Sequence, residues 1–156
     1  MISDFDSLAL GPLHHIAFVV PDLERALAEA ATVDGRWKVL RMPGPIQIRT
    51  SAGHSSVPLK VAKSRLGSVP IELIEAVAGS PWTPQAHPYV HHFGYWVQPG
   101  ELARLAQRYE AMGLRREGTR WTDSGAIEGW TYHLWESTGV RIGLVEKTEK
   151  AQLEWR

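Results

Sequence analysis

The feature that most constrains the fold is a short motif that occurs twice in the chain. Residues 13–20 read LHHIAFVV and residues 90–97 read VHHFGYWV, so a His-His pair opens an apolar run in both places, displaced by 77 residues. Farther along, IELIE at 71–75 recurs as IGLVE at 142–146, displaced by 71 residues. Two copies of one supersecondary unit explain both displacements, which is the usual structural meaning of an internal repeat.

The first copy opens with a strand and a helix. β-branched and aromatic residues predict a strand over 13–20, and the apolar spacing from Leu23 to Ala30 predicts a helix that ends by Gly35. The remaining predictions for this copy are a turn at 51–56 and strands at 37–42, 46–50, 57–62 and 69–77.

The second copy repeats this order. A strand is predicted over 90–97, and the apolar spacing from Leu102 to Met112 predicts a helix that Gly113 ends. Residues 148–156 are expected to form a tail that is polar except for Leu153 and Trp155. The remaining predictions are a loop at 118–126 and strands at 114–117, 127–136 and 140–147.

This order of elements predicts an α+β fold with a single domain over 1–156. Its two βαβββ modules would span 13–78 and 89–147, joined by a linker at 79–88 that is rich in Pro, Gly and Ser. Neither module alone can bury both its helix and one face of its sheet, so the two are expected to pack together.

Charge and cysteine content exclude several classes of function. The chain has 17 Lys plus Arg and 17 Asp plus Glu, a balance that offers no attraction to nucleic acid or to an anionic membrane. It has no cysteine, so disulfides, Cys-ligated zinc and thiol nucleophiles are excluded. An acidic start without a signal-like apolar segment, and no run near the roughly 20 apolar residues of a membrane helix, predict a cytoplasmic protein. Near-neutral charge does not keep copies apart, so a homodimer is expected.

These motifs resemble those of the vicinal oxygen chelate superfamily, which includes glyoxalase I, methylmalonyl-CoA epimerase, extradiol dioxygenases, and fosfomycin and bleomycin resistance proteins. The resemblance runs from about residue 13 to residue 147, and the opening LHHIAFVVPDLERAL is close to that of glyoxalase-like and epimerase-like members. It implies two βαβββ modules that form a curled mixed sheet with an open cleft, and a divalent metal held in that cleft.

The resemblance also implies which residues bind the metal. In glyoxalase I and the epimerase, one ligand comes from each first strand and one from each last strand. His15 and His92, the second His of each pair, match the first-strand ligands, and Glu72 matches the last-strand ligand of the first module. The fourth position is Gly143. Glu146 cannot replace it without a bulge, because side chains alternate along a strand and a shift of three residues reverses the face.

Two His and one carboxylate suit one divalent transition metal, such as Zn, Ni, Co, Mn or Fe, and leave coordination positions open. The plainer alternative is that each His is a buried residue satisfied by hydrogen bonds. Alternation also predicts that His14 and His91 face away from the cleft, where they would support the ligand His residues or pack on a helix. Glu75 and Glu146 are expected on the outer face, solvated or ion-paired.

Other residues are candidates for catalysis or for a substrate pocket. With glycine at position 143, a base must come from elsewhere, and Glu72 or His133 is possible, although a structural role is the plainer explanation for His133. Gln47 and Arg49 share one strand face, where Arg49 could bind a carboxylate or phosphate, and a solvated face is the plainer alternative. The predicted pocket is completed by Trp96, Trp121 and Gly143.

The leading hypothesis is a divalent-metal-dependent isomerase, lyase or hydrolase that resembles glyoxalase and methylmalonyl-CoA epimerase. It would act on a small oxygen-bearing substrate, a carbonyl or acyl compound, through an enolate or oxyanion-like intermediate. One alternative is a metal-free small-molecule binding protein of the antibiotic-sequestering type, which Gly143 and the seven tryptophans favour. The other is an Fe(II) oxygenase, although extradiol dioxygenases take their carboxylate from the closing strand, where this chain has Gly143.

Overall fold

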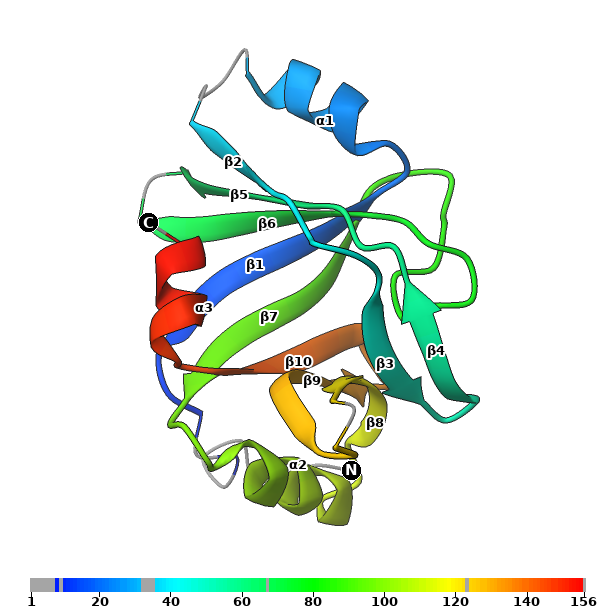
Figure 1. Cartoon of the computed structure of the whole chain (residues 1–156), viewed down its shortest axis with the longest axis vertical. Coiled ribbons are helices and arrows are strands. Elements are labelled where there is room, and N and C mark those ends of the chain that lie inside the picture. Colours follow the sequence, from blue (N-terminus) through cyan, green and yellow to red (C-terminus); the bar gives the residue numbers. More distant parts are fainter. Residues whose placement is uncertain (1–7, 9, 32–35, 67, 123, 156) are drawn as a thin grey trace.

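A computed structural model describes residue 8 and residues 10–31, 36–66, 68–122 and 124–155 (Figure 1). The first half contains β1 (Leu13–Val20), α1 (Leu23–Ala30), β2 (Trp37–Leu40), β3 (Ile46–Thr50), β4 (Gly53–Val57), β5 (Val61–Leu66) and β6 (Val69–Glu75). The second half contains β7 (Tyr89–Val97), α2 (Leu102–Ala111), β8 (Arg115–Trp121), β9 (Ile127–Trp135), β10 (Val140–Glu146) and α3 (Glu149–Glu154). Within these described ranges, no helix is long and apolar enough to cross a lipid bilayer.

All of these strands belong to one mixed sheet, in the order β2-β5-β6-β1-β7-β10-β9-β8-β3-β4. In each half the last strand lies parallel to the first, β6 beside β1 and β10 beside β7. β1 and β7 pair antiparallel and join the two halves at the middle of the sheet. Figure 1 shows the sheet curling from β2 at one edge toward β8. The predicted α+β fold of two modules that form a curled, open mixed sheet is confirmed.

One hairpin, β3–β4, departs from two equal modules. By sequence it belongs to the first module, but β3 pairs with β8 of the second, with Ile48 opposite Arg120. Its bounds also differ from those predicted, because β4 occupies most of the expected turn at 51–56 and β5 begins only at Val61. The small polar residues of β4 do not predict a strand. β4 forms at the edge of the sheet because its backbone groups pair with those of β3.

Apolar side chains of this hairpin pack into the inside of the sheet. Trp82, which is 1% exposed and comes from the predicted linker, joins them and meets Trp130 edge-on, with ring centroids 5.6 Å apart. The buried members of this cluster are Ala17, Val19, Ile46, Ile48, Val57, Val61, Ile74, Trp82 and Tyr132. A second cluster lies under α2, where the Tyr109 hydroxyl donates to the carbonyl of Leu8 at 2.9 Å.

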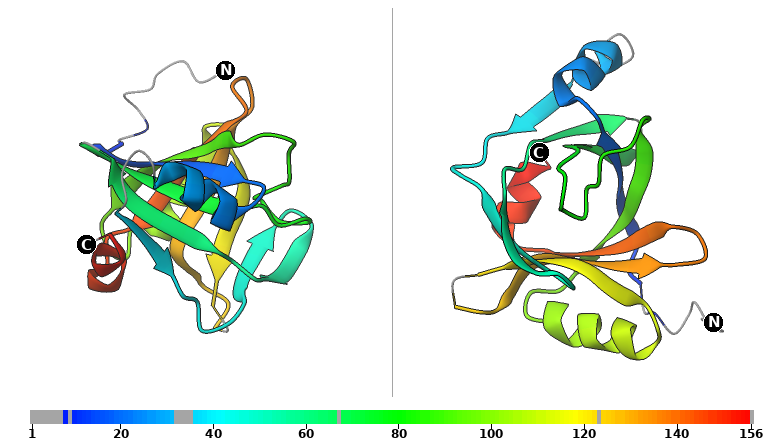
Figure 2. Two further views of the ribbon diagram at one scale, coloured as in Figure 1. Left: turned by 90° about the horizontal axis from the view of Figure 1, so that it is seen from above. Right: turned by 90° about the vertical axis from the view of Figure 1, so that its right-hand side faces the viewer.

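The residues predicted as a polar tail contain helix α3. Thr148 caps it, because its Oγ1 accepts a hydrogen bond from the backbone N–H of Ala151 at 3.1 Å, and this capping threonine was the overlooked signal in the sequence. In the right-hand view of Figure 2, α1 and α2 lie on the outer side of the sheet, whereas α3 lies within the outline of its curl. β8 also extends to Trp121, so the loop before β9 is shorter than the predicted 118–126.

Candidate metal centre

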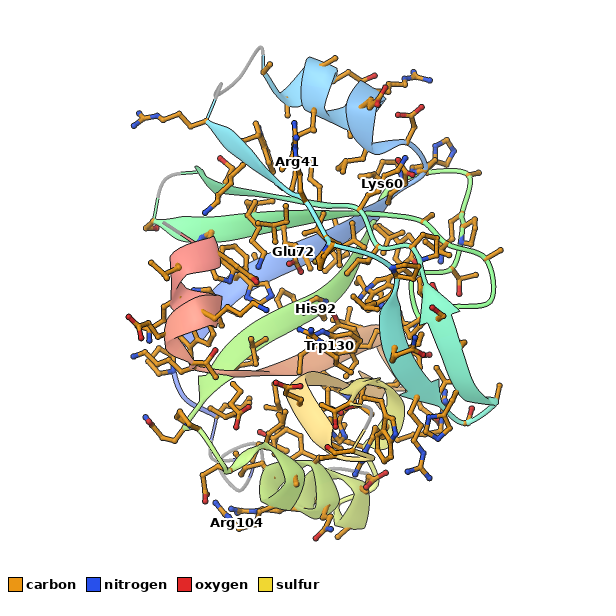
Figure 3. The ribbon with its side chains drawn as sticks, viewed as in Figure 1. Arg41, Lys60, Glu72, His92, Arg104 and Trp130 are labelled. Carbon is orange, nitrogen blue, oxygen red and sulfur yellow. The ribbon has the colours of Figure 1, made fainter. Side chains whose placement is uncertain are left out.

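Three side chains from neighbouring strands meet near the middle of the sheet. His15 is on β1, Glu72 on β6 and His92 on β7. The register places Glu72 and His92 opposite Ala17 of β1, so both point to the same face as His15, two residues earlier on that strand. Figure 3 shows Glu72 and His92 close together near the centre of the molecule.

The nitrogen and oxygen atoms of these side chains are close enough to share one ion. His15 Nε2 lies 2.9 Å from His92 Nε2, and Glu72 Oε2 lies 3.9 Å from the first and 3.8 Å from the second. Three points at these separations lie on a circle of about 2.1 Å radius, the distance at which zinc binds imidazole nitrogen and carboxylate oxygen. His15, Glu72 and His92 therefore form a group that could hold a metal ion.

Burial sets the protonation of this group. His15 is 2% exposed, His92 1% and Glu72 9%. Burial is the largest of the causes that lower the pKa of both histidines well below the ordinary 6.5, so both rings are neutral at neutral pH and can offer a lone pair. Burial likewise raises the pKa of Glu72, and the ammonium of Lys63 opposes that effect. A cation bound to the three atoms would favour the ionised carboxylate.

The two His-His pairs form a chain of four hydrogen-bonded rings. Within each pair the Nδ1 atoms lie 2.9 Å apart, so His14 contacts His15 and His91 contacts His92. The chain ends where His91 Nε2 donates to the carbonyl of Pro81 at 3.1 Å. His14 and His91 do not simply face away as alternation predicts. Each lies at a β-bulge between β1 and β7, and a bulge interrupts the alternation of side chains.

The direction of these hydrogen bonds determines the tautomer of His92. A carbonyl only accepts, so the Nε2 of His91 carries a proton. Burial lowers the pKa of His91 to about 3, so its ring is neutral and its Nδ1 accepts from the Nδ1 of His92. The Nε2 of His92 is then unprotonated and accepts a hydrogen bond from the Nε2 of His15. His92 is thus already in the tautomer that a metal ligand needs, whereas His15 must move its proton from Nε2 to Nδ1, toward His14.

Two glycines make room for the imidazole rings. Gly94 of β7 and Gly143 of β10 are partners in the parallel pairing. A Cβ added at Gly94 would lie 1.9 Å from Cε1 of His15, and one added at Gly143 would lie 2.6 Å from Cδ2 of His92. The His92 ring therefore covers the position that the resemblance assigns to a fourth ligand, and a side chain there would push the ring away.

The structure brings only some of the predicted pocket residues to this centre. Trp96 lies against His14, with ring centroids 4.1 Å apart. Gln47 and Arg49 instead face solvent, because the alternate residues of β3 point into the core. Trp121 accompanies Arg49, whose guanidinium carbon lies 4.8 Å from the centroid of its ring.

The structure does not bring His133 to this group. On β9 it alternates with Tyr132, whose ring lies 4.5 Å from that of His92, so His133 points to the opposite face. There its ring lies 5.3 Å from that of Tyr109 on α2. It is fully buried, and burial is the main cause that lowers its pKa to about 4. These surroundings are those of a structural histidine.

Two residues that the sequence did not assign to this group complete its surroundings. Lys63 of β5 lies opposite Glu72 in the antiparallel pairing, with its Nζ 3.7 Å from Glu72 Oε1. Trp155, which follows α3, lies over His15 with ring centroids 4.7 Å apart. Correct bounds for β5 would have placed Lys63 beside Glu72, and a large apolar residue in a polar tail was the signal for Trp155.

The sequence of the chain matches one family model over most of its length. Residues 14–132 match a family described as the Glyoxalase/Bleomycin resistance protein/Dioxygenase superfamily. No curated protein sequence is significantly similar to the chain.

Solved structures of methylmalonyl-CoA epimerases have a similar fold. The Mycobacterium tuberculosis enzyme superposes with a TM-score of 0.57 and 15% identity over 92% of this chain and 93% of that chain. A variant of the Streptomyces coelicolor enzyme, in complex with 2-nitronate-propionyl-CoA, has a TM-score of 0.55 and 17% identity over 90% and 96%. A hypothetical protein from Bacillus halodurans has a TM-score of 0.54 and 20% identity over 88% and 95%. At these identities the similarity establishes the fold alone.

The substitution Gly143→Ala tests whether bare backbone is needed beneath His92. The added methyl group would displace the ring, so we expect the affinity for zinc or cobalt to fall by at least about tenfold and the free energy of unfolding to fall by about 1–3 kcal/mol. Calorimetric metal titration measures the first effect. Gly44→Ala is the matched control, because a Cβ there meets nothing within 4 Å. Unchanged metal affinity in Gly143→Ala would contradict this account of the glycine.

His133→Gln tests the effect of burial on acid stability. The unfolded chain takes up a proton on this residue near pH 6.5, whereas the folded chain does so only near pH 4. Stability is therefore lost as pH falls through this window, by up to about 1.4 kcal/mol per pH unit. The variant should lose less stability than the wild type between pH 7 and pH 4.5 in urea unfolding experiments. His54→Gln, at an exposed histidine, is the control, and equal pH dependence in wild type and His133→Gln would refute the assignment.

Proposed function

Because the chain belongs to the glyoxalase/bleomycin resistance protein/dioxygenase superfamily, and because His15, Glu72 and His92 meet at the centre of its sheet, we propose that it is a metal-dependent enzyme. It acts on a small carbonyl or acyl compound and promotes isomerisation, lyase or hydrolytic chemistry by stabilising an enolate or a similar oxyanion. The metal is one divalent ion, such as zinc, nickel, cobalt, manganese or iron.

The observation that carries this proposal is the geometry of the three ligand atoms. They come from three strands and yet lie on a circle of about 2.1 Å radius. The surrounding bonds support the same use, since the hydrogen bonds from Pro81 through His91 leave the Nε2 of His92 unprotonated and facing His15 and Glu72.

The residues around the three ligands have separate roles in the proposed reaction. A bound divalent ion supplies a positive charge that polarises the substrate oxygen. His15, Glu72 and His92 would hold that ion, and we assign to Glu72, the carboxyl group of this set, the role of accepting a proton from the carbon beside the carbonyl. Burial raises the pKa of Glu72 and a bound cation opposes that effect, so the carboxyl group is held ionised, as a proton acceptor must be. Trp155 covers His15 and limits the access of water.

One observation favours a second candidate, a metal-free binding protein. A single proton shared between the Nε2 atoms of His15 and His92, 2.9 Å apart, satisfies both rings without a metal. Trp96, Tyr132 and Trp155 would then supply an aromatic surface for the ligand.

Metal stoichiometry decides between the two candidates. After incubation with zinc, cobalt or nickel and removal of excess ion, we expect about one equivalent of metal per chain in wild-type protein and less than about a tenth in His15→Ala and His92→Ala. Elemental analysis measures it. His87→Ala, at an exposed histidine in the linker, should bind as the wild type does. Absence of metal from the wild type would favour the binding protein, and full stoichiometry in both site variants would show that the ligands lie elsewhere.

Solvent exchange tests the enolate chemistry. Metal-loaded protein in deuterium oxide should introduce deuterium at the carbon next to the carbonyl of at least one member of a panel of small oxo acids and acyl thioesters, as followed by NMR. Glu72→Gln, loaded to the same metal content, should exchange at least about a hundredfold more slowly, because its amide cannot accept the proton. Metal-loaded wild type that exchanges no member of the panel would exclude this chemistry while leaving the metal site intact.

A further inference from the structure

Lys63 is a buried charge that the proposed reaction leaves without a role. Its side chain is 8% exposed, which is unusual for lysine unless a partner is present. Two carboxylates face its Nζ, Glu72 at 3.7 Å and Glu154 at 3.0 Å, and the centroid of the Trp155 ring lies 4.3 Å away. Glu72 faces the two histidines with Oε2 and Lys63 with Oε1, so Glu154 is the partner of Lys63 that lies outside the metal group.

Glu154 reaches Lys63 from α3, a helix that is lightly attached to the sheet. None of the residues of α3 is buried, and Leu153 is 51% exposed. Its attachments include the ion pair of Glu154, a hydrogen bond of 3.0 Å from Lys38 Nζ to the carbonyl of Leu153, and the contacts of the Trp155 ring. The carboxylate of Glu154 is 34% exposed, so water can solvate it when it leaves Lys63. Moving the helix away also exposes the Trp155 ring, which is 7% exposed and packs on His15, and this is the main cost of the movement.

The charges around Lys63 indicate what would replace Glu154. The positive charges of a divalent cation and of the Lys63 ammonium together exceed the single negative charge of Glu72. Without Glu154, the buried site would therefore carry excess positive charge. A bound anion would relieve that excess. The group already in place on Lys63 is a carboxylate, and a substrate carboxylate can make the same charge-assisted hydrogen bond.

We propose that Lys63 binds a carboxylate group of the substrate, and that Glu154 occupies this position when no substrate is bound. The inference rests on the proposed function, because it places the substrate carboxylate beside the metal group. It narrows the substrate class to small carbonyl compounds that carry a carboxylate. Binding then separates Glu154 from Lys63 and moves α3, together with Trp155, away from the centre.

A pair of probes tests this assignment. 4-Oxopentanoate carries a carbonyl and a carboxylate, and 4-oxopentanamide replaces the carboxylate by a neutral amide. In NMR titrations of zinc-loaded full-length protein, we expect the acid to bind at least about tenfold more tightly than the amide, as is typical of a hydrogen bond to a charged group. Hydrogen exchange of the amides in 149–155 should rise when the acid binds and should stay unchanged with the amide.

Two substitutions should have opposite effects on the acid. Glu154→Gln removes the internal competitor, so the affinity for 4-oxopentanoate should rise by about threefold or more, with no change for the amide. Lys63→Met keeps the apolar stem of the side chain, and it should lower the affinity for the acid to that for the amide. Glu149→Gln removes the same charge from an exposed position of the same helix, and it should behave as the wild type does.

Several results would overturn the assignment. Equal binding of acid and amide to the wild type shows that no carboxylate is recognised, and unchanged binding of the acid in folded Lys63→Met shows that it binds elsewhere. If Glu154→Gln leaves the affinity for the acid unchanged, or tightens both probes equally, Glu154 is only a latch for α3. Zinc content is measured first. If the protein takes up no zinc, the proposed function fails, and the same titrations on zinc-free protein still test the exchange at Lys63.

Discussion

The arrangement of side chains at the centre of this molecule depends on two glycines, which leave room above the backbone for the imidazole rings of His15 and His92. His15 and His92 come from antiparallel strands at the join of the two modules, and their rings must approach each other to bring the Nε2 atoms within 2.9 Å. Gly94 and Gly143, paired between β7 and β10, leave the space for both rings. Neither glycine has a positive φ, so each is needed for its missing Cβ and not for its conformational freedom. A side chain at either position would separate the rings and open the triangle of ligand atoms.

The two modules share a fold and differ in chemistry around this contact. Each contributes a His-His pair at a β-bulge, and the bulge turns the first ring so that its Nδ1 meets the Nδ1 of the second. On the side of the second module the chain of rings ends at a carbonyl, which leaves His92 one tautomer. On the side of the first module it reaches His14, a half-buried ring beside Trp96 and Trp155, and the Nδ1 of His14 is the atom with which His15 can exchange its proton. The repeat therefore holds one ligand in place and leaves the other adjustable.

The sequence predicted what the repeat determines and little beyond it. The displacements of 77 and 71 residues led to the two modules, and the resemblance to the vicinal oxygen chelate superfamily led to His15, Glu72 and His92 as one group. Alternation failed at His14 and His91, because a bulge depends on the partner strand and leaves no local pattern. The β3–β4 hairpin pairs with β8 of the other module, a long-range choice that its small polar residues do not encode. Lys63 was missed for the same reason. The predicted strand at 57–62 ended before Lys63, whereas β4 takes up Val57 and β5 spans Val61–Leu66.

The carboxylate that the second module lacks at Gly143 has a counterpart in Glu154, which comes from outside the repeat. The two would carry the same charge, but they differ in mobility. A carboxylate at position 143 would belong to a central strand and would lower the positive charge of the site permanently. Glu154 lowers it through Lys63, at 3.0 Å, and only while α3 is in place. With the proposed exchange, the site gains positive charge when the helix leaves, which is the moment at which an anionic substrate must enter. The glycine of β10 and the carboxylate of Glu154 on α3 then act together, because the first leaves the positive charge of the site uncompensated and the second compensates it only until the substrate binds.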